Sequence, residues 1–187
     1  EAGEQLKRAG CEHPTHVFVQ AGVGSLAGAI VGYFTNLYPD NPPIFVVVEA
    51  DVAACLYKSA AAKDGAPHNV SGDMQTIMAG LACGEPNTIS WDILRNHVTA
   101  FLAIPDWVAA LGMRMLAAPI KGDVPVTSGE SGATPFGALA VIMTDDNYKD
   151  LRKKIGLNKD SQILLFSTEG DTDPIRYKNI VWHGLDK

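Results

Sequence analysis

Short runs of β-branched and aromatic residues alternate along the chain with segments whose apolar residues recur at helical spacing. Runs at 16–20, 44–48 and 162–166 are almost continuously apolar, as is typical of parallel strands buried on both faces, and 98–104 reads as a further strand. The spacing predicts helices at 4–9, 25–38, 52–63, 76–82, 90–97, from 105 onward, and at 135–143, 146–155 and 174–182. Asp51 and Ser90 are the predicted caps of the third and fifth helices, and Pro174 suits the first turn of the last.

Strand, helix and strand follow one another from residue 16 to residue 48, which is a βαβ unit with a right-handed crossover. The pattern predicts an α/β fold with three layers, in which a mostly parallel sheet carries helices on both faces. No repeat or long linker interrupts the chain, so residues 1–187 are predicted to form one domain.

Composition narrows the class of protein. The 187 residues are 47% hydrophobic and 19% charged, as in a soluble globular domain. A net charge of −6 gives no reason to expect a nucleic acid or an anionic membrane as partner, and no apolar run reaches the length of a membrane span. With no recognisable signal peptide and only three cysteines, the predicted location is the cytoplasm.

No metal site is predicted, because neither the cysteines nor the five histidines have ligand spacing. Cys55 and Cys83 are read as buried free thiols, with a disulfide between them as the alternative.

A glycine-rich turn at 21–28 joins the first strand to its helix and has the layout of a phosphate cradle. Its glycines let the backbone approach an anion, the N–H groups at the helix start point toward it, and Ser25 adds a donor or a cap. The turn also fits a strand–helix junction that binds nothing. No Gly-Lys-Ser/Thr follows, so it is not a P-loop. Its spacing misses the dinucleotide fingerprint by one residue, yet the acids Glu49 and Asp51 keep that reading open at this point.

Two more polar turns, at 128–133 and 167–173, also follow strands or extended segments. Ligands of open α/β sheets bind at the carboxyl ends of the strands, so all three turns are expected to gather at one edge. With Glu130 and Ser167 inside them, a phosphorylated cofactor becomes the better interpretation.

The same three turns resemble the motifs of fold-type II pyridoxal-phosphate enzymes, the tryptophan synthase β family. The loop 21–28 resembles their phosphate loop, 128–133 their Glu-x-x-Gly-Ala turn, and 167–171 their C-terminal serine motif. Nearly the whole chain resembles the C-terminal half of the diaminopropionate ammonia-lyase family. The most specific stretches are 71–74, 76–87, 109–114 and 167–173.

The resemblance implies α,β-elimination of 2,3-diaminopropionate to pyruvate and ammonia, with pyridoxal 5′-phosphate as cofactor and a homodimer as assembly. It implies that the Ser167 hydroxyl faces the pyridine nitrogen, with Thr168 as the near alternative, and that Glu130 lies near the ring. The phosphate would be held by backbone N–H groups of Gly22, Val23, Gly24, Ser25, Leu26 and Ala27.

The family's Schiff-base lysine lies in an N-terminal half, well before the phosphate loop. Lysines such as Lys7, Lys58, Lys63 and Lys121 sit in no such context and are read as solvated surface. We therefore expect a C-terminal portion that is inactive alone and is completed by an N-terminal half. The alternatives are a non-catalytic module that binds a phosphate cofactor or a nucleotide, and another fold-type II lyase such as a serine/threonine dehydratase. A dehydrogenase-like domain fits neither the loop spacing nor the Ser167 motif.

Overall fold

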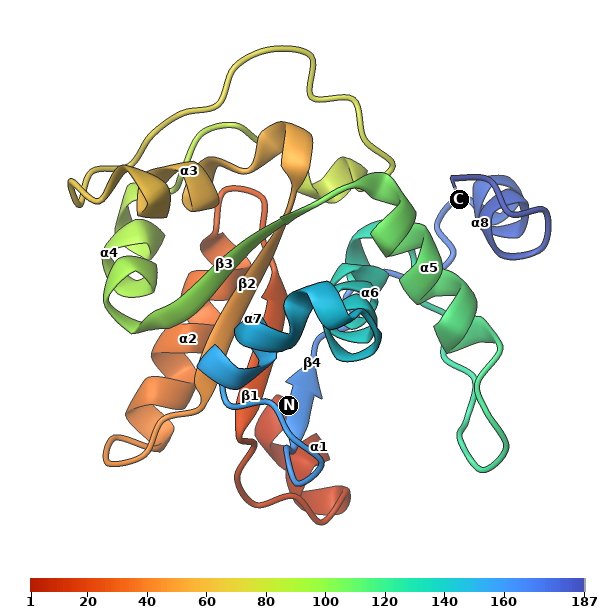
Figure 1. The fold of residues 1–187 in the computed structure, drawn as a ribbon, viewed down its shortest axis with the longest axis horizontal. Helices are drawn as coiled ribbons and strands as arrows, with labels where there is room; N and C mark the ends of the chain where they lie inside the picture. The colour runs from red at the N-terminus through yellow and green to blue at the C-terminus, as the bar shows by residue number, and fades with distance from the viewer. Residues whose placement is uncertain (187) are drawn as a thin grey trace.

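A four-stranded parallel sheet forms the centre of the chain in the computed structural model, which describes residues 1–186 (Figure 1). The strand order is β3-β2-β1-β4, and all three strand pairings are parallel. The strands are β1 (His16–Gln20), β2 (Ile44–Ala50), β3 (Val98–Ile104) and β4 (Ile163–Leu165). The predicted α/β class with a parallel sheet is confirmed, and the first and third of these strands begin and end where the sequence predicts.

Side chains of the two central strands alternate between two separate apolar cores. Val17 and Val19 belong to the core on one face of the sheet, whereas Phe18 belongs to the core on the other face. In β2, Val47 and Val46 divide in the same way. Both faces are therefore buried, which explains why the sequence of these strands is continuously apolar instead of alternating.

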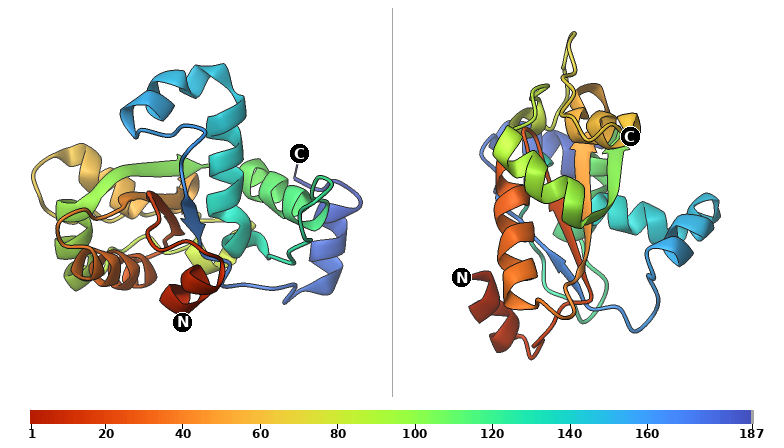
Figure 2. Two further views of the ribbon diagram at one scale, coloured as in Figure 1. Left: turned by 90° about the horizontal axis from the view of Figure 1, so that it is seen from below. Right: turned by 90° about the vertical axis from the view of Figure 1, so that its left-hand side faces the viewer.

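Helices cover both faces, as Figures 1 and 2 show: α2 and α4 pack on one side, and α5 and α6 on the other, with α8 against α5. The helices are α1 (Ala2–Arg8), α2 (Ser25–Leu37), α3 (Cys55–Ala62), α4 (Thr88–His97), α5 (Asp106–Ala117), α6 (Glu130–Thr144), α7 (Lys149–Lys154) and α8 (Pro174–Val181). Single 3₁₀ turns lie at Asp51–Ala53, Ala79–Leu81 and Asp146–Tyr148. Within residues 1–186 no helix combines the length and the apolar character needed to cross a bilayer.

Two glycines allow α5 and α6 to approach closely. A Cβ added to Gly112 would lie 2.5 Å from the carbonyl oxygen of Ala133, and one added to Gly137 would overlap the carbonyl oxygen of Val108. The two helix backbones are therefore in direct contact at this crossing, which fixes the position of α6 relative to the sheet.

The helix predicted at 52–63 is wrong at its start. The chain forms a 3₁₀ turn at Asp51–Ala53 and bends at Ala54, and α3 begins only at Cys55. Asp51 caps nothing; instead Glu49 Oε1 accepts from the Leu56 N–H at 2.8 Å and Oε2 from the Tyr57 N–H at 2.7 Å. The buried carboxyl group of Glu49, at the end of β2, thus accepts from two N–H groups in the first turn of α3.

The short helix predicted at 76–82 is also wrong, because only Ala79–Leu81 forms a 3₁₀ turn. The preceding backbone is drawn toward the start of α5. The Thr76 hydroxyl donates to the Asp106 carboxylate, which also accepts from the Ile77 N–H at 3.2 Å. These long-range bonds replace the local ones that a helix would need.

Asn87, not Ser90, is the cap of α4. Its side-chain oxygen accepts from the Ser90 N–H at 2.9 Å, and the helix begins at Thr88. We expect Asn87→Ala to lower the free energy of unfolding by about 1 kcal/mol in urea titrations. Asn96→Ala, in the exposed last turn of the same helix, is the matched control and is expected to change it by less than about 0.5 kcal/mol. Equal losses would contradict the capping role.

Candidate functional site

The three polar turns meet at the carboxyl-terminal edge of the sheet, as the sequence predicts, around a cavity of about 380 Å³. Strand β1 and the first turn supply one wall, the 3₁₀ turn after residue 78 supplies another, and the remaining two turns close it. The lining residues are Gln20, Ala21, Gly22, Val23, Gly24, Ser25, Leu26, Gly80, Leu81, Cys83, Ser131, Thr168 and Glu169.

The start of α2 presents uncapped backbone N–H groups to this cavity. Gly24 precedes the helix with a φ of 97°, a left-handed conformation that favours glycine, and no side chain caps the first turn. That turn contains no acidic residue, and Ser25 is exposed. Backbone N–H groups without a capping side chain, together with the positive end of the helix dipole, favour binding of a phosphate.

The second and third turns are bound to each other. The backbone N–H of Ser131 donates to Glu169 Oε2 at 2.6 Å, that of Gly132 to the same oxygen at 3.3 Å, and that of Gly129 to the Glu169 carbonyl at 2.9 Å. Because a carboxylate from another part of the chain caps it, α6 begins at Glu130. The prediction that this helix starts at Pro135 is therefore wrong.

The two hydroxyls after β4 have different partners. Gln20 Nε2 donates to Thr168 Oγ1 at 2.8 Å and to the Phe166 carbonyl at 3.0 Å, and Thr168 lines the cavity. The Ser167 hydroxyl donates to Ser128 Oγ at 2.8 Å, and Ser167 is not among the lining residues.

Glu130 likewise does not line this cavity. Its carboxylate lies 3.4 Å from Arg176 Nε of α8. Burial raises the pKa of Glu130, Glu169 and Asp173 raise it further, and Arg176 opposes them. Among the site residues predicted from the sequence, Thr168 and those of the first turn up to Leu26 line the cavity. Glu130 and Ser167 do not.

Sequence reasoning missed Gln20, Ser131 and Glu169 as lining residues. Ser131 and Glu169 stand inside the motifs already noted for other residues, which was the available signal. Gln20 ends an apolar strand, and a polar residue that closes a buried strand beside a glycine-rich turn is the signal that would have found it.

The residues present fit a phosphorylated, polar ligand. Gln20 Oε1 and Ser131 Oγ are buried and have no hydrogen-bond partner, although both residues line the cavity. Buried polar atoms without partners are rare, and here they lie beside the open amides of α2. None of the lining residues is a lysine.

The three cysteines are free thiols, so the alternative of a Cys55–Cys83 disulfide is not formed in this structure. The Cys55 thiol donates to the Cys83 carbonyl at 3.5 Å and contacts the Gly22 carbonyl at 3.7 Å. Burial and the neighbouring Glu49 raise the pKa of Cys55 to about 12, so its thiol is uncharged where it packs against Gly22 and Cys83. The part of the chain that the structure describes contains no cluster of three or more metal-ligating His, Cys, Asp or Glu side chains.

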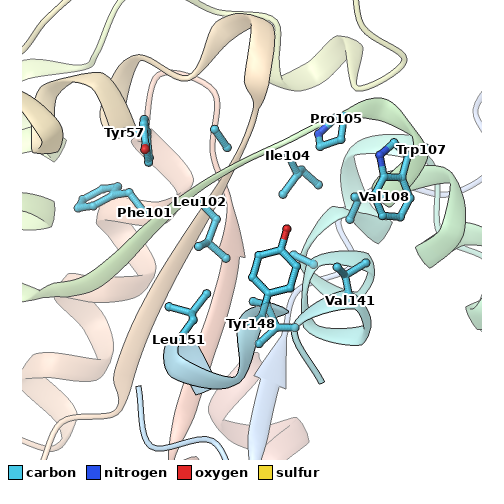
Figure 3. A pocket seen from close by; sticks show the side chains of 13 residues that line it. Tyr57, Phe101, Leu102, Ile104, Pro105, Trp107, Val108, Val141, Tyr148 and Leu151 are labelled. Atoms are coloured by element: carbon cyan, nitrogen blue, oxygen red, sulfur yellow. The ribbon is translucent and has the colours of Figure 1, made fainter. Parts of the chain in front are cut away.

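A second cavity, of about 350 Å³, lies beside β3 and is apolar (Figure 3). Tyr57, Phe101, Trp107 and Tyr148 stand around it, and no charged side chain lines it. Its polar side-chain groups are the hydroxyls of Tyr57 and Tyr148 and the indole N–H of Trp107, and it has no positively charged side chain for a phosphate. It therefore does not compete with the cavity at the strand ends as a phosphate site.

A family model described as "Pyridoxal-phosphate dependent enzyme" matches residues 1–168. Diaminopropionate ammonia-lyase of Salmonella typhimurium is 51% identical over 185 residues, which are 98% of this chain and 46% of that protein. The chain therefore spans about half the length of the curated relatives it matches.

Solved structures agree with the sequence matches. Escherichia coli diaminopropionate ammonia-lyase in complex with D-serine superposes with a TM-score of 0.88 at 44% identity, covering 99% of this chain and 45% of that one. The selenomethionine-labelled holo form of the same enzyme gives 0.89 at 45% identity, with the same coverage. The resemblance read from the motifs of the sequence is confirmed.

Proposed function

Because the chain belongs to the family of pyridoxal-phosphate dependent enzymes, we propose that its cavity holds pyridoxal 5′-phosphate and serves the α,β-elimination of 2,3-diaminopropionate to pyruvate and ammonia. The observation that carries this proposal is the meeting of three polar turns around one cavity, into which the uncapped start of α2 opens.

In the proposed arrangement, backbone N–H groups from Gly22 to Ala27 bind the phosphate, and Ser25 adds a hydroxyl donor. A hydroxyl after β4, of Ser167 or Thr168, donates to the pyridine nitrogen and holds the ring in one orientation. The bound cofactor supplies the electron-withdrawing ring that stabilises negative charge at the substrate Cα. Glu130 is placed by the resemblance near the ring; in this structure its carboxylate neutralises Arg176 instead.

We assign the cofactor-binding lysine to the half of the relatives' length that this chain does not match, since none of the lining residues is a lysine. The proposal further includes a small amino acid as substrate, a homodimer or a complementing half as assembly, and a cytoplasmic location, which the three free thiols support. The isolated chain is then expected to bind the cofactor without turning over substrate.

Titration with pyridoxal phosphate, followed by absorbance, tests the cradle. Ser25→Asp is expected to weaken binding about tenfold or more, because it places a carboxylate beside the phosphate. Ser25 is exposed, so the change leaves the fold intact. Asn36→Asp adds the same charge in the exposed last turn of α2 and is expected to leave the affinity unchanged. Pyridoxal, which lacks the phosphate, is expected to bind much more weakly to all three proteins.

Two outcomes would contradict the proposal. Tight binding of AMP with no measurable binding of pyridoxal phosphate would favour the non-catalytic nucleotide module. Borohydride reduction that attaches the cofactor stoichiometrically to one lysine of this chain, found by mass spectrometry, would show that the chain carries its own nucleophile.

A further inference from the structure

Gly80 and Leu81 form a wall of the cofactor cavity that no long helix or strand supports. They belong to the 3₁₀ turn Ala79–Leu81, and the residues just before this turn, 74–78, are neither helix nor strand. Backbone outside helices and sheets must find other partners for its N–H and carbonyl groups. The position of this wall therefore depends on packing and on side chains from elsewhere in the chain.

One such partner is the carboxylate of Asp106, the first residue of α5. Asp106 Oδ1 accepts from the Thr76 hydroxyl, and Oδ2 accepts from the Ile77 N–H at 3.2 Å. Thr76 Oγ1 in turn accepts from the Met78 N–H at 3.1 Å, and the Met78 carbonyl accepts from the Leu81 N–H at 2.8 Å. A continuous series of hydrogen bonds thus leads from α5 to the cavity wall.

The donors at this position require an acceptor with two oxygens. A backbone N–H can only donate, and the Thr76 hydroxyl, which already accepts from Met78, has one hydrogen to give to Asp106. A carboxylate accepts at both oxygens, whereas an amide side chain accepts at only one. Both oxygens of Asp106 are thus used on residues 76 and 77, and no side chain caps α5 itself.

Gly80 lies close to two other walls of the cavity. A Cβ added to Gly22, in the glycine-rich turn before α2, would lie 3.3 Å from the Gly80 carbonyl oxygen, and one added to Gly80 would lie 3.0 Å from Ser131 Oγ. Because there is little free space on either side, a displacement of residues 76–81 changes the shape of the cavity. With the phosphate at the start of α2, the ring of the cofactor must fit between the remaining walls, to which Gly80 and Leu81 belong.

We propose that Asp106 and Thr76 are positioning residues that fix the Gly80 wall, and that they support binding of the cofactor ring but not of its phosphate. This inference rests on the proposed function, because it presumes that pyridoxal phosphate occupies the cavity. Neither side chain lines the cavity, so both act through the backbone of residues 77–81. A wall held in place before the ligand arrives raises affinity, because less order has to be created on binding.

Titration with pyridoxal phosphate and with inorganic phosphate separates the ring from the phosphate. Asp106→Ala and Thr76→Val are expected to weaken binding of pyridoxal phosphate about tenfold, the effect of losing one hydrogen bond to a charged group, and to leave binding of inorganic phosphate unchanged. Thr76→Ser, which keeps the hydroxyl, is expected to retain the affinity of the unmodified chain. Thr144→Val is the matched control, because this exposed hydroxyl bonds to the Ala140 carbonyl within α6.

The double variant tests whether the two residues act together. Because both belong to one series of hydrogen bonds, Asp106→Ala combined with Thr76→Val is expected to weaken binding about as much as either change alone, whereas independent contributions would multiply to about a hundredfold. The visible circular dichroism of bound pyridoxal phosphate reports the asymmetric surroundings of its ring. It is expected to decrease in both single variants and to be retained in Thr76→Ser.

The inference is overturned if Thr76→Val binds pyridoxal phosphate as tightly as the unmodified chain does, or if both ligands lose affinity equally, which indicates a general loss of structure. Thr76→Val preserves the shape of the side chain, so it decides the test even if Asp106→Ala does not fold. If the unmodified chain itself does not bind pyridoxal phosphate, the proposed function fails and the inference with it. The two failures are distinguishable, because only the second is seen without any substitution.

Discussion

Replacing Gly137 by alanine is expected to lower the free energy of unfolding by about 3 kcal/mol. The added Cβ would overlap the Val108 carbonyl oxygen, which belongs to the backbone of α5 and cannot rotate away. Only a displacement of one helix relieves the overlap, and α6 carries Ser131 in the wall of the cavity. Urea unfolding measures the loss of stability, and titration with pyridoxal phosphate is expected to show weaker binding.

Gly32→Ala in α2 is the matched control. Its added Cβ would lie 3.9 Å from Ile93 Cδ1, an ordinary contact, so the gain in helix propensity is expected to stabilise the chain by about 0.5–1 kcal/mol. Changes of the same sign and size in both variants would contradict the close contact between α5 and α6.

The elements that follow from local sequence were predictable. The strands at His16–Gln20 and Val98–Ile104 have their predicted bounds, because both are rich in β-branched and aromatic residues, which favour an extended backbone. The last helix likewise begins at Pro174, as predicted, and Asp173 Oδ1 accepts from the Ile175 and Arg176 N–H groups of its first turn.

The elements that depend on distant partners were not predictable. The start of α6 is set by the Glu169 carboxylate, which lies 38 residues beyond Ser131 in the sequence. Because proline usually occupies the first turn of a helix, Pro135 led to a predicted start several residues too late. Similarly, Asp51 was the cap predicted from local sequence. Because the chain bends at Ala54, the N–H of Leu56 is instead bound by Glu49, seven residues earlier.

The site shows the same division. The glycine-rich turn before α2 could be recognised from the sequence, because glycines before a helix allow the backbone to approach a ligand closely. The different surroundings of Ser167 and Thr168 could not be predicted, because they depend on contacts with Ser128 and Gln20 across the sheet edge. Sequence thus located the three turns that line the cavity, whereas the hydrogen-bond partners of their side chains required the structure.

The free energy of unfolding is expected to fall as pH rises from about 4.5 to about 8, because Glu49 is buried. Burial raises the pKa of Glu49 to about 8, although the N–H groups of Leu56 and Tyr57 and the Cys55 side chain oppose this. Below pH 4.5 both the folded and the unfolded chain hold the proton. Between the two values only the folded chain keeps it, so ionisation favours unfolding; above about 8 both have lost it.

The expected loss across this window is about 3 to 5 kcal/mol, and Glu49→Gln is expected to remove it, leaving a flatter pH profile in urea or thermal unfolding. Glu85→Gln, at an exposed glutamate, is the control that keeps the slope of the unmodified chain. If the free energy of unfolding of the unmodified chain and of Glu49→Gln changed with pH in parallel, the pH dependence could not be attributed to Glu49.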